Sequence, residues 1–149
     1  MALSLPKDAL LALAAVGWAD GNLDRDEAAA LLRVAREAGL TPAELLEIEA
    51  ATKMPLAIAD VTTVRLGRAD RVLTYALGTW LARLDGVVTP EERDSLVLLG
   101  DRLGLPDGMR TRASAAAFEI AEASDRPERY DFAALEARIR QKLGDVEAE

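Results

Sequence analysis

The sequence predicts an all-α protein, a compact bundle of about seven helices. Half of the 149 residues are hydrophobic but only 4% are aromatic, so small and aliphatic side chains are expected to make up most of the core. The only strand-like run, VTTV at 61–64, is too short to build a sheet on. A chain of this length is expected to form one domain, residues 1–149, with its own core.

Capping and stop residues mark where each helix begins and ends. Thr41-Pro42-Ala43-Glu44 is expected to begin a helix. Thr is a good capping residue, Pro suits the first helical position, and the Glu side chain can accept a hydrogen bond from the backbone N–H of the Thr. Thr89-Pro90-Glu91-Glu92 repeats that formula, and Gly39 and Gly104 suit the left-handed residue that closes a helix. The expected helices are 4–18, 24–39, one opening at 41, 68–84, 89–104, 107–123 and a last one carrying Phe132, Leu135, Ile139 and Leu143, with one or two further turns between Pro55 and Gly67.

The chain is acidic, and this excludes some partners. It has 18 basic and 26 acidic residues, a formal charge of −8, with no cluster of Lys or Arg. Such a surface is repelled by nucleic-acid phosphates and by anionic lipid headgroups. We therefore expect no nucleic-acid partner and no direct membrane insertion.

Cysteine and histidine are both absent from the sequence. Their absence excludes disulfides, zinc sites of the Cys/His type, histidine-ligated haem, thiol nucleophiles and an imidazole general base. A metal ion bound here must be a hard cation held by oxygen atoms, such as calcium or magnesium.

The N-terminal region carries no targeting pattern. Its uncharged run, residues 9–19, is much shorter than a membrane span, and Lys7 is followed at once by Asp8. The expectation is a soluble, cytoplasmic protein whose first helix belongs to the fold.

An internal repeat appears when the sequence is shifted by 65 residues. ADGNLDRDEAAALLRVAREAGL (19–40) then aligns without a gap with LDGVVTPEERDSLVLLGDRLGL (84–105), and six of the 22 positions are identical. Each unit, about 5–40 and 68–105, reads as a helix, an acidic turn and a second helix closed by glycine. Such a duplication is expected to pack about an approximate twofold axis, each unit burying the other's apolar face.

The repeated pattern resembles the TerB-like domain, the family that includes the tellurite-resistance protein TerB. The resemblance rests on ADGNLDRDE, on the Ala/Leu-rich helix closing in AGL, and on the echo LDGVVTPEE. It implies a compact helical bundle with two similar halves, no enzymatic activity, a role in bacterial stress or tellurite resistance, and metal binding by acidic residues on one side.

The acidic turns fit half of a calcium-binding loop. In DGNLDRDE, Asp20 stands where a side-chain ligand would be and Glu27 where the closing glutamate would be. In DGVVTPEE, Asp85 and Glu92 take the same places. The positions of the earlier ligands hold no carboxylate in either copy, so a complete EF-hand is excluded.

A purely structural role accounts for the same residues. Asp-Gly forms a tight turn, Asp24 or Thr89 caps the following helix, and the glutamate three residues later returns the bond. The duplication favours metal binding. If the two turns lie close together in space, they bring many carboxylates together, and these either repel one another or bind a cation. The hypothesis is weak binding of a hard divalent cation, and its residues are Asp20, Asp24, Asp26, Glu27, Asp85, Glu91 and Glu92.

Three functions remain open from the sequence. The first is a non-enzymatic stress domain that binds cations or protein partners through this acidic face. The second is a structural adaptor that binds a protein partner without metal, and the least favoured is a carboxylate-based hydrolase.

Trp18 and Trp80 are expected as core residues. The arginines near the C-terminus are expected to form exposed pairs with nearby acids along the chain: Arg126, Arg129, Arg138 and Arg140 with Glu122, Asp125 and Glu136. The oligomeric state is left open.

Overall fold

A computed structural model of the chain describes residues 5–19, 21, 23, 25–83, 89–122 and 130–148, the last seven by their backbone alone. Within these ranges the secondary structure is helical and contains no strand, which confirms the predicted all-α class. None of the helices in this part of the chain combines the length and the apolar character needed to cross a membrane.

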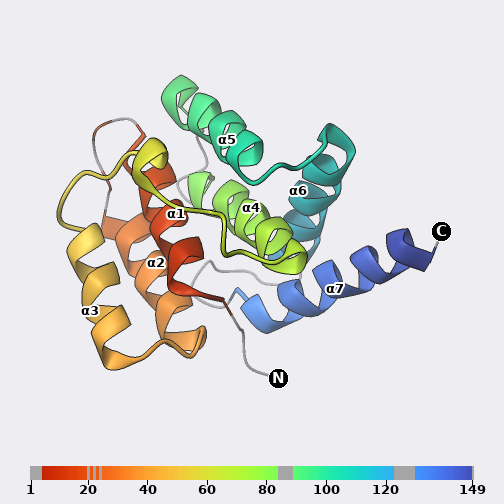
Figure 1. Ribbon diagram of the computed structural model, residues 1–149, viewed down its shortest axis with the longest axis horizontal. Coiled ribbons are helices and arrows are strands. Elements are labelled where there is room, and N and C mark those ends of the chain that lie inside the picture. Colours follow the sequence, from red (N-terminus) through yellow and green to blue (C-terminus); the bar gives the residue numbers. More distant parts are fainter. Residues whose placement is uncertain are drawn as a thin grey trace.

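The predicted helices are all present among the described residues (Figure 1). They are α1 (Lys7–Gly17), α2 (Arg25–Glu37), α3 (Pro42–Ala51), the 3₁₀ turn η1 (Ile58–Asp60), α4 (Arg68–Ala82), α5 (Pro90–Arg102), α6 (Asp107–Glu122) and α7 (Phe132–Ala148). Each described end lies within three residues of the expected one, because the capping and stop signals are local in sequence.

The capping boxes at the starts of α3 and α5 form as predicted. The Thr89 hydroxyl accepts from the Glu92 amide at 3.1 Å, and the Glu92 carboxylate accepts from the Thr89 amide at 3.2 Å. Thr41 and Glu44 make the same pair of bonds. At the other ends of α2 and α5, Gly39 and Gly104 adopt positive φ of 77° and 68°, where a side chain would be strained.

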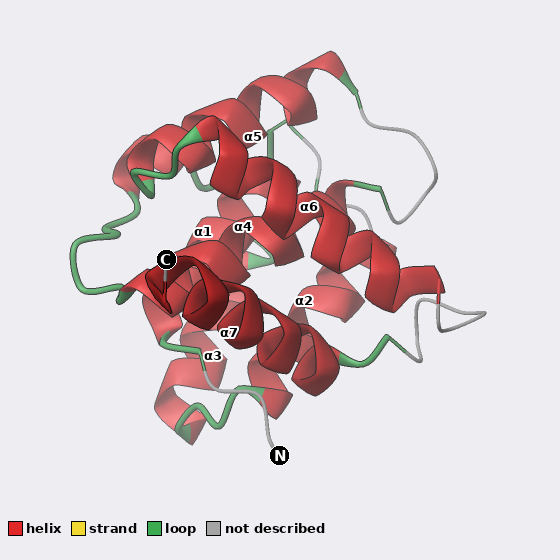
Figure 2. Cartoon of the chain, turned by 90° about the vertical axis from the view of Figure 1, so that its right-hand side faces the viewer, coloured by secondary structure: helices red, strands yellow, loops and turns green. Residues whose placement is uncertain are grey.

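Helix α4 lies at the centre of the bundle and contacts α1, α2, α5, α6 and α7 (Figures 1 and 2). Its broad apolar stripe explains this place, since Leu73, Ala76 and Leu77 are all buried. On one side, α3 packs against α1 and α2, and on the other α7 packs against α4 and α6.

An aromatic cluster holds the start of α7 against the bundle. The Trp80 ring lies 4.4 Å from the Tyr130 ring and 5.2 Å from the Phe132 ring, centroid to centroid. The Tyr130 hydroxyl donates to the Ala117 carbonyl at 2.8 Å, and the Arg33 guanidinium lies 4.5 Å from the centre of the Phe132 ring. Trp80 is only 6% exposed, which confirms its predicted place in the core.

The C-terminal arginines are paired partly as expected. Arg140 bonds Glu136 at 3.0 Å, the predicted partner four residues away along one helix, but Glu136 is buried and not exposed as expected. Arg138 instead reaches Glu119 of α6 at 3.1 Å, because α6 and α7 pack side by side. Arg126 and Arg129 lie outside the described residues.

The segment between α3 and α4 is tied down by arginines. Arg71 donates to the carbonyl oxygens of Thr63, Leu66 and Leu103 at 2.8–2.9 Å. Arg102 donates to the Val61 carbonyl at 2.6 Å. These bonds hold the segment against α4 and the end of α5, and so fix one wall of the site described next.

Candidate functional site

Four of the seven predicted metal-site residues lie in the described part of the chain, at the starts of α2 and α5. Asp26 and Glu91 are exposed, whereas Glu27 and Glu92 are 8% and 3% exposed. Asp20, Asp24 and Asp85 lie outside the described residues. The two helix starts therefore repeat one arrangement, an exposed acid followed by a buried glutamate.

The Glu92 side chain caps the start of α5. Its carboxylate accepts the Thr89 amide proton, so it satisfies a backbone donor that the helix itself leaves open. This confirms the structural role predicted for Glu92. The corresponding cap of α2 would involve Asp24, which is outside the described residues.

Glu27 and Leu23 lie over the end of α1, where Gly17 leaves room for them. A Cβ atom on Gly17 would come within 2.3 Å of the Leu23 side chain and 3.4 Å of a Glu27 carboxylate oxygen. Leu23 is half-buried and packs on the end of α1. The small residue at 17 thus lets the first acidic turn close against its own helix.

The described acids do not gather around one point. Among the described residues, no three or more acidic side chains lie close enough together to hold a single metal ion. A cation site at the acidic turns would therefore need Asp20, Asp24 or Asp85 as well. The metal hypothesis stays a prediction about those turns.

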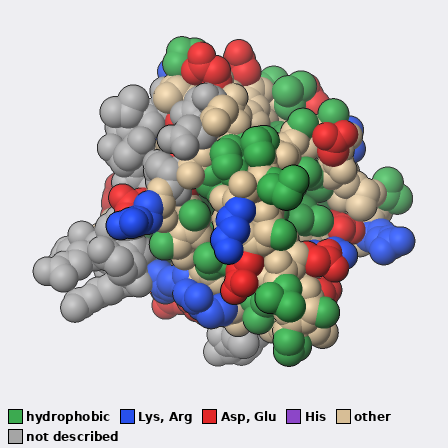
Figure 3. Space-filling view, turned by 90° about the vertical axis from the view of Figure 1, so that its left-hand side faces the viewer, with side chains coloured by type: hydrophobic (Ala, Val, Ile, Leu, Met, Phe, Trp, Pro, Cys, Tyr) green, Lys and Arg blue, Asp and Glu red, His purple; other side chains and the backbone are tan. Residues whose placement is uncertain are grey.

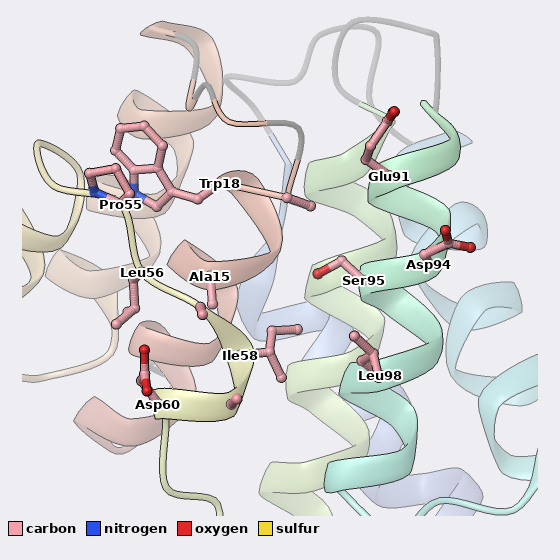
Figure 4. A pocket seen from close by; sticks show the side chains of 13 residues that line it. Ala15, Trp18, Pro55, Leu56, Ile58, Asp60, Glu91, Asp94, Ser95 and Leu98 are labelled. Carbon is pink, nitrogen blue, oxygen red and sulfur yellow. The ribbon is translucent and has the colours of Figure 1, made fainter.

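A groove opens beside the start of α5, between the end of α1 and the segment that carries η1 (Figure 4). We call it the α1–α5 groove; its volume is about 660 Å³. The residues lining it are Ala15, Trp18, Ala19, Pro55, Leu56, Ala57, Ile58, Ala59, Asp60, Glu91, Asp94, Ser95 and Leu98. This volume falls within the range of about 300–1,000 Å³ that is usual for ligand sites.

Apolar side chains from both walls meet across the groove. Ile58, on the η1 segment, points toward α5, and Ser95 and Leu98 of α5 point back toward it (Figure 4). Ile58 and Ser95 are buried, while Leu98 is 55% exposed. The floor is thus built into the fold, and its outer part is open to solvent.

Trp18 forms the end wall of the groove, beside Pro55 (Figure 4). Its indole N–H donates to the Ala51 carbonyl at 2.8 Å, and the side chain is only half-buried. The expectation that Trp18 is a core residue is therefore corrected. Its polar edge has a backbone partner at the end of α3, and part of the ring stays open to solvent.

The charges on the groove are all of one sign. Among the described residues, its lining holds three exposed carboxylates, Asp60, Glu91 and Asp94, and no Lys or Arg. Of the four predicted site residues that the structure describes, only Glu91 belongs to this groove. Asp60, Asp94, Trp18 and Leu98 were not predicted as part of a site. The only local signal was the Met54-Pro55 break, after which the chain runs irregularly along α1 and α5.

Comparison with protein-family models, with curated proteins and with solved structures finds no match to this chain. The resemblance to the TerB-like domain therefore depends on the chain's own residues. The groove and the two acidic helix starts are the features of the described chain that bear on its function.

Proposed function

We propose that this chain is a non-enzymatic, TerB-like stress domain that binds a protein partner through the acidic face around the α1–α5 groove. The observation that carries the proposal is the composition of the described groove lining: an apolar floor edged by three carboxylates, with no basic residue among those described. Clustered apolar side chains provide binding free energy, and charges at the edge select the partner. The sequence also lacks the histidine and cysteine that most acid–base and nucleophilic sites use.

The positions of the helices support a duplicated architecture of the TerB-like kind. α2 spans 25–37 and α5 spans 90–102, an offset of 65 residues at both ends. α1 and α4 end at 17 and 82, and α3 and α6 begin at 42 and 107, with the same offset. We propose that the units α1–α2 and α4–α5 pack about an approximate twofold axis.

The contacts between the units are reciprocal, as such an axis requires. α1 contacts α4, its counterpart in the other unit. α1 also contacts α5, and the matching pair, α4 and α2, is in contact as well. The symmetry would be broken outside this core, because α7 packs on α6 and α4, and the described chain places no eighth helix on α3.

Weak binding of calcium or magnesium is a second proposed function of the acidic face. It is favoured by the repeated placement of an exposed acid beside a buried glutamate, Asp26 with Glu27 and Glu91 with Glu92. The alternative is a structural adaptor that binds its protein partner without metal. In that case the glutamates serve only the helix starts, as Glu92 does.

Site-specific photo-cross-linking in the host cell tests the protein-binding proposal. A photoreactive phenylalanine analogue replaces Leu98 in the groove or, as a matched control, Leu46, which is 65% exposed on α3 outside the groove lining. The proposal predicts one discrete adduct from position 98 that is absent from position 46. Equal labelling from both positions, or none from either, would contradict it.

The stress role needs a separate test. A host strain lacking this chain is complemented with the wild type or with Leu98→Asp, and survival on tellurite is compared. The proposal predicts that only the wild type restores survival. Equal survival of the deletion strain and its parent would remove the tellurite part and leave the binding proposal in place.

A further inference from the structure

We infer that the occupant of the α1–α5 groove is a basic, amphipathic segment of a partner protein. Its apolar side chains would lie against Ile58 and Leu98, and its Lys or Arg side chains would face Asp60, Glu91 and Asp94. This inference rests on the proposed function and adds the chemistry of the partner.

The apolar part of the groove offers a surface on which side chains of a partner can pack. Ala15 and Ile58 are buried and close the floor. Leu98 keeps more than half of its surface in water although it points toward the groove (Figure 4). Removing that surface from water on binding yields about 25 cal/mol per Å². Trp18, on the end wall, supplies the kind of large ring that often dominates an interface.

Exposed hydrophobic side chains continue beyond the groove. Val97, next to Leu98 on α5, is 52% exposed. On the face that Figure 3 shows, hydrophobic side chains lie in several groups, with basic and acidic side chains between them. An amphipathic segment longer than the groove would therefore find further apolar surface beside it.

The carboxylates of the groove are free to pair with a partner. Asp60 stands on the η1 segment, and Glu91 and Asp94 stand on α5, so these acids border the groove on both walls. In the described part of the chain, none of the three has a salt bridge within the protein, and no lining residue is basic. A segment with several cations would complement this edge, whereas an acidic segment would be repelled.

The spacing of these acids distinguishes separate cations from one metal ion. The described residues include no three acids close enough to share an ion, and this holds for Asp60, Glu91 and Asp94. Lys and Arg side chains along a peptide are spaced by several ångströms, and each can reach its own carboxylate. The three acids therefore suit a basic segment better than a single calcium or magnesium.

Other macromolecular occupants are disfavoured by the charge of the chain. A second copy would bring another −8 to an edge that is already acidic. Nucleic acids and anionic membranes carry the same sign of charge. A basic protein segment is the occupant that relieves the repulsion.

A random-peptide selection tests the inference without knowing the partner. A phage-displayed library of 16-residue peptides is selected on the wild-type chain, and enriched peptides are counter-screened on two groove variants, Asp60→Lys/Asp94→Lys and Leu98→Ser. Matched controls are Glu122→Lys and Leu46→Ser, which change an exposed acid on α6 and an exposed leucine on α3. Circular dichroism checks that every variant is folded.

The inference predicts enriched peptides with apolar residues at helical or alternate spacing and an excess of Lys and Arg. Synthetic copies should bind the charge-reversal variant about tenfold more weakly or worse, the loss expected from two unfavourable charge pairs, and should bind the controls like the wild type. Enriched peptides that use the groove but carry no basic excess would overturn the inference and leave the proposed function standing. Failure to enrich any peptide sensitive to the groove variants would overturn both.

Discussion

The indole N–H of Trp18 donates to the carbonyl oxygen of Ala51 across 33 residues of sequence, at 2.8 Å. The bond joins the end of α1 to the end of α3, and it gives a donor to a carbonyl group in the last turn of α3. It also sets the ring as the end wall of the α1–α5 groove. One hydrogen bond thus links the stability of this corner to the shape of the proposed binding site.

Replacing Trp18 with Phe keeps an aromatic wall but removes the bond to Ala51. We expect a loss of about 1 kcal/mol in the free energy of unfolding, the usual net value of one such bond. Trp80→Phe should cost more, because Trp80 lies inside the aromatic cluster and its loss of volume leaves a cavity. Urea denaturation measures both, and an unchanged midpoint for Trp18→Phe would argue against a bond that matters for stability.

In Gly17→Ala the new Cβ would come within 2.3 Å of the end of the Leu23 side chain, so this flexible, half-buried side chain has to shift. We expect a net loss of less than about 1 kcal/mol in the free energy of unfolding, because the cost of overpacking is partly offset by the better helix propensity of alanine. Gly108→Ala is the matched control: it lies in the first turn of α6 with nothing within 4 Å of the new atom. We expect that control to be neutral or more stable, because alanine is the better helix former by about 1 kcal/mol.

A double-mutant cycle with Leu23→Ala tests whether contact with the Leu23 side chain causes the cost of Gly17→Ala. In the background Leu23→Ala, the Gly17→Ala substitution should lose most of its cost, since the clashing methyl group is gone. Costs that simply add would show that the first acidic turn does not close on Gly17.

Burial of Tyr130 predicts a loss of stability at high pH. Burial raises the pKa of its hydroxyl above the ordinary value of 10.0, so the native state keeps the proton where the unfolded state releases it. The stabilising contribution is complete below about pH 10 and is lost as the pH rises above it. Chemical denaturation between pH 8 and pH 11 should therefore show a falling free energy of unfolding.

The two tyrosines of the chain allow an internal control for this pH effect. Tyr130→Phe should flatten the alkaline fall and, at neutral pH, cost about 1 kcal/mol for the lost bond to Ala117. Tyr75→Phe should leave most of the fall, because Tyr75 is only half-buried although burial raises its pKa too. Equal flattening by both variants would contradict the assignment to Tyr130.

Calorimetric titration with calcium and with magnesium separates the two proposed roles of the acidic turns. If the turns hold a cation, the wild type should release or absorb heat at millimolar metal, and Asp20→Asn/Asp85→Asn should not. If they serve only as turns and caps, neither protein should respond. Glu122→Gln, an exposed acid on another helix, is the control for unspecific screening.

The helices could be predicted from the sequence because their signals are local. Thr41 with Glu44 and Thr89 with Glu92 lie three residues apart, and both pairs form the expected boxes. Gly39 and Gly104 likewise close their helices by their own conformation. The repeat offset of 65 residues, read from the sequence, reappears in the helix ends.

The groove could not be predicted, because its walls come from distant segments. Asp60 and Asp94 are 34 positions apart, and they share one groove only because Arg71 and Arg102 hold the intervening segment against the bundle. Trp18 was misplaced for a similar reason: a tryptophan at the end of an apolar helix suggests burial, and its partner, the Ala51 carbonyl, is not visible in the sequence. Of the described residues of the acidic site predicted from the turns, Glu91 alone belongs to the groove.

The most direct test of the account is an NMR titration of the whole chain with a synthetic basic peptide taken from the selection. The chain has two indole N–H groups, Trp18 in the groove and Trp80 in the core, which give separate signals. We predict that the Trp18 indole and the amides of Ile58, Ser95 and Leu98 shift together while the Trp80 indole stays in place. Shifts confined to other helices, with the Trp18 signal unmoved, would contradict binding at the α1–α5 groove.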